Sequence, residues 1–174
     1  GASASFAGGD GSAECPYLIA DADQLNNVRN DLSAHYKLIA DIDLAGTPYG
    51  VNWEPIGTQA APFKGTFDGD GHKIINLIID LPSQISVGLF SKTSSGAVIR
   101  NIGLVNANVT GWGVVGGLVG ENFGSITNVY STDANLSAAN NGIGGLVGDN
   151  SGSIAFSYAK VSVIGGNNVG GLVG

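Results

Sequence analysis

The chain repeats one short glycine-rich phrase at nearly constant spacing, and this repeat constrains the fold more than any other feature. A shortened copy is followed by three full copies of (Val/Ile)-Gly-Gly-Leu-Val-Gly, and the first glycines of the four copies are Gly88, Gly116, Gly144 and Gly170. Successive copies therefore lie 28, 28 and 26 residues apart. A period in this range predicts a solenoid, in which each repeat forms one coil and buries its apolar face against the neighbouring coils.

A second pattern between the glycine phrases aligns the coils with one another. Four short apolar segments align with isoleucine in the first column, namely Ile74, Ile99, Ile126 and Ile154. The third column holds Asn76, Asn101 and Asn128, and then Phe156 in the last copy. Because strands of adjacent coils lie about 4.8 Å apart, the alignment predicts an aliphatic ladder and, at a bend, a ladder of side-chain amides that satisfies unpaired backbone groups. Phe156 is expected to interrupt the amide ladder.

Each repeat has room for three strands joined by turns of Asn, Gly and Ser, so the sequence predicts an all-β fold. Because the repeats are stacked coils of three strands each, we expect a right-handed parallel β-helix of about 26–28 residues per coil. Glycine is abundant, at 29 of 174 residues, which by itself could suggest disorder. However, 43% of the residues are hydrophobic, and Ile, Val and Leu recur at fixed places between the glycines, which indicates an ordered fold. The paired glycines are expected where a neighbouring wall leaves no room for a side chain.

The segments before the repeats differ from them in composition. Residues 1–14 are mostly small and rich in Gly, Ser and Ala, and predict a flexible segment ahead of a single β-helix domain over 15–174. Within this domain, residues 45–86 begin with a proline-rich stretch and predict irregular first coils, whereas 87–174 hold the regular repeats. The last repeat stops halfway, so we expect the chain to be a fragment of a longer protein.

Residues 15–44 predict an N-terminal cap. Asp21 followed by Gln24 resembles a capping box, and the apolar residues after it follow helical spacing, so a helix is expected over about 22–33. A solenoid needs such an atypical terminal unit, because an uncovered coil would expose strand edges and an apolar face.

Charge and cysteine content exclude several classes of function. The formal net charge is −7, and the seven Lys and Arg residues are scattered without a basic run, which argues against binding to nucleic acid or anionic membranes. No apolar run approaches 18 residues, so membrane insertion is not expected. The single cysteine, Cys15, cannot form an internal disulfide, and its role stays open.

The glycine phrases and the segments before them resemble a known repeat family. The pattern GGLVG-x-N-x-G-S-I resembles the GLUG motif, a repeat of large bacterial surface and secreted proteins. Residues 8–44 and 63–79 look like the stretch that precedes such repeats. Proteins with this motif include adhesin-like exoproteins and the non-catalytic regions of surface metallopeptidases that cleave immunoglobulin A. The resemblance implies an exported, stalk-like or adhesive β-helix.

Residues that could carry catalysis or bind a metal are few. His35 and His72 are the two histidines, and neither belongs to an HExxH zinc motif. Asp68 and Asp70 lie in an Asp-Gly-Asp-Gly stretch and are weak candidates for Ca²⁺ ligands, although a turn between two strands explains them equally well. We therefore expect no catalytic residue and no cofactor, with Ca²⁺ as the remaining candidate.

Aromatic residues in loops are the candidate binding groups. Trp53 and Trp112 can stack on sugars or on protein partners, and Trp112 lies between two glycines in a loop between coils. The alternative for Trp112 is that it covers the edge of a coil. Tyr130 and Tyr158 fall in one column and are interpreted as wall packing.

Together these observations predict a non-catalytic adhesive or structural stalk module of a bacterial cell-surface or secreted protein. Its partners would be proteins or glycans of a host or neighbouring cell, contacted through the inter-coil loops, and a longer parent protein could carry a catalytic domain elsewhere. The alternative is a carbohydrate-binding or polysaccharide-degrading β-helix of the lyase or glycosidase kind. The incomplete final coil also predicts end-to-end self-association.

Overall fold

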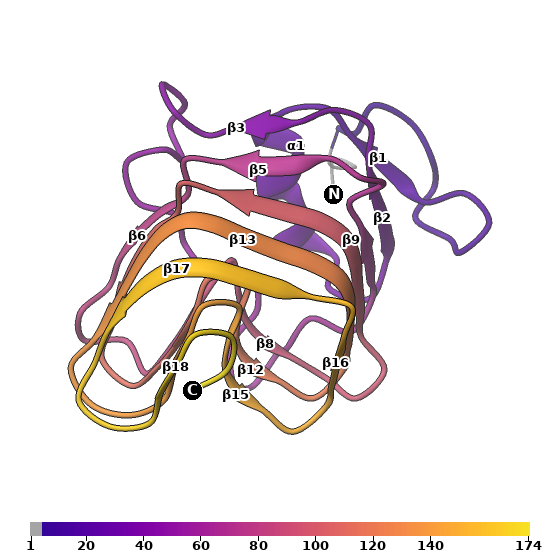
Figure 1. Cartoon of the computed structure of the whole chain (residues 1–174). Coiled ribbons are helices and arrows are strands. Elements are labelled where there is room, and N and C mark those ends of the chain that lie inside the picture. Colours follow the sequence, from indigo (N-terminus) through magenta and orange to yellow (C-terminus); the bar gives the residue numbers. More distant parts are fainter. Residues whose placement is uncertain (1–4) are drawn as a thin grey trace.

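The protein is a right-handed parallel β-helix of about five coils, as the sequence predicts (Figure 1). The computed structural model describes residues 5–174. Figure 1 looks along the solenoid, and the chain runs anticlockwise in this view as it advances from the N-terminal coils toward the yellow C-terminal coil in front. Nearly all strand pairs are parallel, so each coil stacks on the one before it in the same direction.

Within the part of the chain that the structure describes, eighteen strands build the coils. The N-terminal coils contain β1 (Tyr17–Ile19), β2 (His35–Leu38), β3 (Ile42–Asp43), β4 (Thr66–Asp68), β5 (Lys73–Ile75), β6 (Ile78–Asp80), β7 (Ser86–Val87) and β8 (Phe90–Thr93). The later coils contain β9 (Val98–Val105), β10 (Asn108–Gly111), β11 (Val114–Gly116), β12 (Val119–Asn122), β13 (Ser125–Ala138), β14 (Ile143–Gly144), β15 (Val147–Asn150), β16 (Ser153–Ala155), β17 (Tyr158–Ile164) and β18 (Val169–Gly170).

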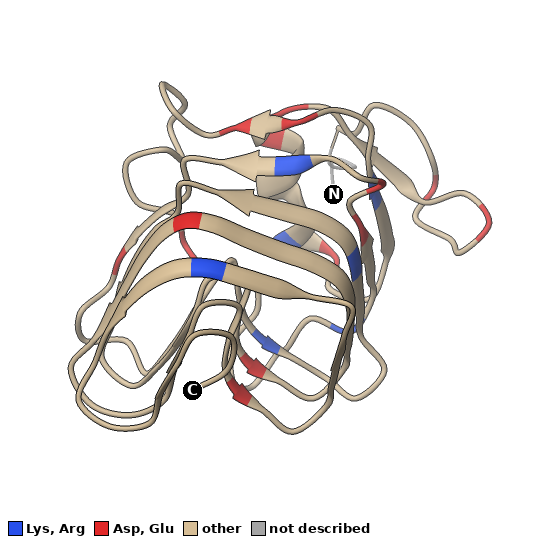
Figure 2. Cartoon of the chain, viewed as in Figure 1, with Lys and Arg blue, Asp and Glu red and all other residues tan. Residues whose placement is uncertain are grey.

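Within residues 5–174, three sheets form the walls. The large sheet has eleven strands and bends around the coil. One half contains β1, β2, β4 and β16, the other half contains β3, β5, β6, β10 and β17, and the long strands β9 and β13 run through both halves. A four-stranded sheet contains β7, β11, β14 and β18, and a three-stranded sheet contains β8, β12 and β15. Figure 2 shows that most of the ribbon in these walls is formed by residues other than Lys, Arg, Asp and Glu.

The N-terminal helix lies where the sequence predicts it but is shorter. Helix α1 (Ala22–Asn26) begins at Asp21, whose side chain accepts a hydrogen bond from the Gln24 N–H at 2.9 Å, and a 3₁₀ helix, η1 (Asn27–Asn30), continues it. The expected end at residue 33 is wrong, because the Leu32 carbonyl accepts hydrogen bonds from the N–H groups of Lys64 and Gly65 (2.7 and 3.0 Å). The chain has therefore left the helix to join the next coil.

The segment predicted to be flexible, residues 1–14, is ordered in its described part, which begins at residue 5. The Ala7 N–H donates to the Leu18 carbonyl at 2.9 Å, so this segment pairs with β1. The Phe6 ring stacks on Tyr17 with 4.4 Å between centroids. Hydrogen bonding to an open strand edge outweighs the flexibility that the small residues suggest.

The aliphatic ladder is confirmed for three of its four predicted members. Ile99, Ile126 and Ile154 are register partners in β9, β13 and β16. Ile74 is not part of this column, because it pairs with Ile42 on one side and Leu104 on the other.

The register error arises in the Asp-Gly-Asp-Gly turn. Phe67 and Lys73, six residues apart, pair with Ile99 and Gly103, four residues apart. The turn thus holds two more residues than the corners of the later coils, and Phe67 takes the position expected for Ile74.

Asparagine side chains do hydrogen-bond between coils, but the predicted members of the amide ladder belong to two different corners of the coil. At the first corner, Asn128 donates to the side-chain oxygen of Asn101 at 2.9 Å, and both residues have positive φ (55° and 56°). Phe156 follows them with φ 50° and ends the ladder, as expected. Asn76 belongs instead to the second corner, where it accepts a hydrogen bond from Asn106 at 2.7 Å.

Each glycine phrase forms a corner that joins the end of one strand to the start of the next. β11 ends at Gly116 and β12 begins at Val119, so the phrase turns the chain from the four-stranded into the three-stranded sheet. A Cβ atom on Gly117 would lie 2.7 Å from the Gly145 carbonyl oxygen of the next coil. The prediction that a neighbouring wall excludes side chains here is confirmed.

Candidate functional site

The loops between coils stack into a continuous ridge. The Trp112 N–H donates to the Gln84 carbonyl at 2.9 Å, the Asn140 N–H to the Trp112 carbonyl at 2.9 Å, and the Asn167 N–H to the Asn140 carbonyl at 3.0 Å. We call this surface the turn ridge and define it by residues 84–85, 112–113, 140–141 and 167–168. Because each loop is hydrogen-bonded to the next, the ridge presents its side chains from a fixed backbone.

The turn ridge has an apolar half and an amide half. Trp112 is 43% exposed, and Ile85, in the preceding loop, is 59% exposed. The later loops contribute Asn140, Asn141 and Asn167. The expectation that Trp112 faces solvent is confirmed, whereas its role in binding stays a prediction. An aromatic ring beside amide groups suits contact with a surface that is partly apolar and partly polar.

Trp53 does not form part of any exposed surface, and its assignment as a binding residue is wrong. Its side chain is 1% exposed, and its indole N–H donates to the Leu89 carbonyl at 3.2 Å. The Arg29 guanidinium lies 5.4 Å from the centre of the ring. The residues around Trp53 form a wall rather than a surface loop, because the Ile56 carbonyl accepts a hydrogen bond from the Ser91 N–H at 2.9 Å.

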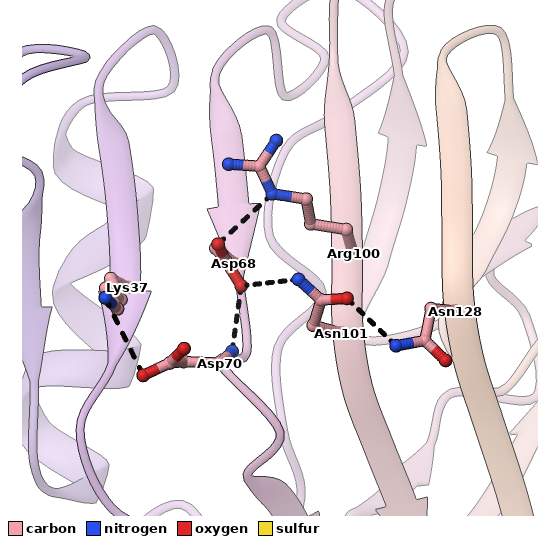
Figure 3. Close-up of polar contacts among 6 residues, drawn as sticks. All are labelled: Lys37, Asp68, Asp70, Arg100, Asn101 and Asn128. Atoms are coloured by element: carbon pink, nitrogen blue, oxygen red, sulfur yellow. Dashed lines mark hydrogen bonds and ion pairs between the residues drawn. The ribbon is translucent and has the colours of Figure 1, made fainter.

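Asp68 and Asp70 are each engaged with a basic side chain (Figure 3). The Arg100 Nε donates to Asp68 Oδ2 at 3.1 Å, and the other Asp68 oxygen accepts from the Asp70 N–H (2.8 Å) and the Asn101 amide (3.2 Å). The Lys37 Nζ lies 3.7 Å from Asp70 Oδ2. The four residues and the Asn101 ladder form one polar network across β2, β4 and β9.

Electrostatics explain why Asp68 is held ionised. Partial burial by itself raises the pKa of Asp68, but the hydrogen bonds from the Asp70 N–H and the Asn101 amide and the contact with Arg100 outweigh it, so that the pKa lies below the usual aspartate value. This network does not fit a Ca²⁺ site, because both Asp68 oxygens already accept hydrogen bonds and a guanidinium cation lies beside them. Within residues 5–174, no three His, Cys, Asp or Glu side chains are grouped to hold a metal ion. The structural interpretation, a turn fixed by its acids, is favoured.

Two further polar contacts contain residue types that hydrolases use. His72 Nδ1 lies 3.2 Å from Asp41 Oδ1, and that same oxygen accepts from the Lys73 N–H at 3.1 Å. On the opposite wall, the Ser86 hydroxyl donates to Glu121 at 2.5 Å. Asp41 thus connects the N-terminal cap, residues 15–44, to the start of β5, and Glu121 connects two adjacent coils. Both contacts therefore have a structural explanation.

Comparison with known proteins gives two relatives and one solved structure. No family model matches the chain. The chain is 43% identical, over 97% of its length, to a “Putative Gly-rich membrane protein” of Evansella cellulosilytica, and 38% identical, over 71% of its length, to halomucin of Haloquadratum walsbyi. It is also similar to a solved chain from Bacteroides ovatus named as a putative immunoglobulin A1 protease, with a TM-score of 0.72 and 28% identity over 90% of this chain.

The chain matches only part of each of these proteins. It spans 21% of the length of the Evansella protein, 2% of halomucin and 50% of the Bacteroides chain. The comparisons define a β-solenoid module that occurs in proteins whose names point to the cell surface or to secretion. The GLUG assignment itself is not confirmed, since no family model matches. Within the described residues, no helix has the length and apolar character to span a membrane.

Proposed function

We propose that the chain is a non-catalytic module of a bacterial cell-surface or secreted protein. In this proposal the β-helix is a rigid stalk, and the turn ridge contacts a protein or glycan of a host or neighbouring cell. The names of the relatives support a surface or secreted setting, and the stacked coils support the stalk. Adhesion is proposed from the ridge alone.

The observation that carries the adhesive part is the exposed Trp112 ring on hydrogen-bonded loops. Tryptophan residues are enriched among the side chains that dominate binding energy at interfaces. A ring presented by a fixed backbone loses little conformational freedom on binding, which favours affinity. The glycines on both sides of Trp112 leave the ring open to a partner.

The test is binding of the chain to a glycan array and to immobilised extracellular-matrix proteins, followed by comparison of variants on any ligand found. We expect Trp112→Ala to weaken binding at least about tenfold, the loss of one aromatic contact of about 1.4 kcal/mol. Val51→Ala is the matched control, because Val51 is 79% exposed and lies outside the ridge. Equal affinity of Trp112→Ala and the wild type would contradict the proposal.

The polysaccharide-degrading alternative is less well supported, because Asp68 and Asp70 are both paired with basic side chains. It is tested by incubating the chain with uronic-acid and neutral polymers and measuring chain cleavage. Turnover that disappears in Asp68→Ala or Asp70→Ala would replace the non-catalytic proposal.

End-to-end self-association is proposed through the last coil. Among the described strands, β16 and β17 pair with β13 alone, so their other edges carry unpaired N–H and carbonyl groups. Sedimentation velocity over a hundredfold range of concentration tests this proposal, and a single monomeric species throughout would contradict it.

A further inference from the structure

Two tyrosines on the outer surface of the large sheet form a flat aromatic platform. Tyr130 in β13 and Tyr158 in β17 are register partners, their ring centroids are 5.5 Å apart, and their planes differ by 12°. Tyr158 is 58% exposed. The two rings therefore stack outside the coil and are not part of its core.

A glycine in the neighbouring strand makes room for this platform. Gly103 in β9 is the register partner of Tyr130. A Cβ atom on Gly103 would overlap the phenol end of the Tyr130 ring, so that ring lies over the backbone of β9. The Tyr130 ring thus lies on the sheet and stacks against the exposed Tyr158 ring.

Two shallow hollows lie further along the same strands, beginning at the second corner, where Asp133 has φ 56°. The first is lined by Asp133, Asn135, Lys160 and Ser162 together with one alanine, Ala134, and one valine, Val161. The second is lined by polar residues of β10, β13 and β17 and by Ile164. We call them together the sheet groove and define its polar lining as Asn108, Thr110, Asp133, Asn135, Ser137, Lys160 and Ser162.

The two hollows are contiguous with each other, and Tyr158 of the platform lies two residues before the first hollow in β17. Asn135 and Ser162 line both hollows, which makes them one groove. Lys160 follows Tyr158 by two residues in β17, so both side chains lie on the outer face. From Tyr158 to Ile164 the strand rises about 20 Å at about 3.3 Å per residue. This length suits a chain of several units rather than a single small molecule.

We propose that the sheet groove binds a neutral oligosaccharide, with one sugar ring stacked on Tyr158 and the following units in the two hollows. An aromatic ring offers an apolar face to the C–H side of a sugar, and amides and hydroxyls offer both donors and acceptors to its hydroxyl groups. This site lies on the large sheet, and none of the residues that line it belongs to the turn ridge. It therefore does not depend on the adhesive role of Trp112.

Charge supports the choice of a neutral ligand over an anionic one. Asp133 and Lys160 line the same hollow and are of opposite charge, and the other residues that line the two hollows are uncharged. The net charge of −7 also disfavours association with a polyanion. A neutral, hydroxyl-rich chain has no such penalty and matches the amide and hydroxyl lining.

The experiment is titration of the ¹⁵N-labelled chain with cellotetraose, mannotetraose and N-acetylchitotetraose, using tetragalacturonate as the anionic comparator. We expect at least one neutral tetrasaccharide to shift the backbone signals of Asn135 and Ser162, and tetragalacturonate to bind more weakly. Shifts confined to the loops of the turn ridge would overturn the groove while leaving the ridge intact. The absence of shifts with all three neutral sugars at 10 mM, about 2.7 kcal/mol of binding free energy, would also overturn it.

Variants assign the binding to the groove. Tyr158→Ala is expected to weaken binding about tenfold, as the loss of an aromatic contact of about 1.4 kcal/mol implies, and Asn135→Asp to weaken it without disturbing the fold because Asn135 is exposed. Phe123→Ala is the matched control, since Phe123 is a 42% exposed aromatic in the turn after β12, outside the groove. Equal losses in Phe123→Ala and Tyr158→Ala, or unchanged affinity in both Tyr158→Ala and Asn135→Asp, would contradict the proposal.

Discussion

The N-terminal coils, up to β8, and the later coils, from β9 onward, are held together by different kinds of contact. In the N-terminal coils, large aromatic side chains fill the interior, with Phe63 and Phe67 packed against Phe90 at 4.8 and 5.5 Å between ring centroids. In the later coils, the interior holds aliphatic residues in register, such as Ile99 and Ile126. The first region uses contacts that occur once, and the second repeats the same contact from coil to coil.

The charged contacts follow the same division. Each of the four ion pairs among the described residues involves at least one residue before β9, and the last of them joins Asp68 to Arg100 at the boundary. In the later coils, amides replace charges, as in the Asn101–Asn128 pair. A repeating stack places identical side chains one above another, and stacked like charges would repel whereas stacked amides hydrogen-bond. The later coils still stack one acidic pair, Glu121 on Asp149, so the comparison teaches that repetition favours amides without excluding charge.

The strongest test of the comparison uses the two tryptophans. Trp53→Ala is expected to lower the free energy of unfolding by about 4 kcal/mol, because it empties a buried site that no other coil duplicates. Trp112→Ala, at an exposed site of the later coils, is expected to cost less than about 1 kcal/mol. Urea denaturation measures both. Similar losses for the two variants would show that the N-terminal coils do not depend on single large side chains.

A second test concerns the glycine corners of the later coils. Gly117→Ala is expected to lower the free energy of unfolding by about 3 kcal/mol, because the new methyl group would lie 2.7 Å from the Gly145 carbonyl oxygen. Gly171→Ala changes the same position of the phrase in the last copy, where no atom lies within 4 Å, and is expected to change stability by less than about 0.5 kcal/mol. The melting temperatures of the two variants decide the matter. Equal destabilisation of the two variants would mean that these positions require the backbone freedom of glycine and not the absence of a side chain.

A third test repairs the interrupted amide ladder. Phe156 has φ 50° and is 86% exposed, so it pays for a left-handed conformation without gaining burial. Phe156→Asn is expected to raise the free energy of unfolding by about 1 kcal/mol, through relief of strain and extension of the Asn101–Asn128 ladder. Asn128→Ala is the converse change and is expected to lower it by about 1–2 kcal/mol. A Phe156→Asn variant less stable than the wild type in thermal unfolding would contradict this account.

The smallest expected effect lies at the boundary between the two regions and depends on pH. The pKa of Asp68 is lower in the folded chain than the unfolded value of about 3.9, so its stabilising contribution is present above about pH 4 and is lost as the pH falls through the folded pKa. The stability difference between the wild type and Asp68→Asn should therefore be largest at neutral pH and shrink below about pH 4. Asp43, whose pKa is also lowered, is present in both proteins and cancels in the comparison. Thermal unfolding between pH 3 and 7 measures this difference, and a difference independent of pH would rule out the ionised Asp68 as its source.

The sequence predicted the regular coils better than the irregular ones, and the reason is physical. Ile99, Ile126 and Ile154 repeat because every later coil places the same side chain against the same neighbours. Ile74 was assigned to the wrong column because the preceding turn has two additional residues. An alignment of short apolar segments does not reveal such a difference in turn length.

The candidate binding residues show the same limit. Trp53 lies in a proline-rich stretch that looks like a surface loop, and its burial depends on Leu89 and Arg29, which are distant in the sequence. Trp112 was correctly expected to be exposed, since the flanking glycines are a local signal. The outer position of Tyr130 and Tyr158 was visible in the alternation of β13 and β17, but the hollows beside them arise from three strands together.

The stacking of parallel coils has a mechanical consequence. The hydrogen bonds between coils run along the solenoid axis, so a pull on the two chain ends loads them one coil at a time, as in opening a zipper. Each coil released would add about 28 residues of slack, or about 95 Å of extended chain at about 3.4 Å per residue. A surface stalk built this way would unfold in steps under tension, one coil at a time. The extension would limit the force that reaches its point of attachment.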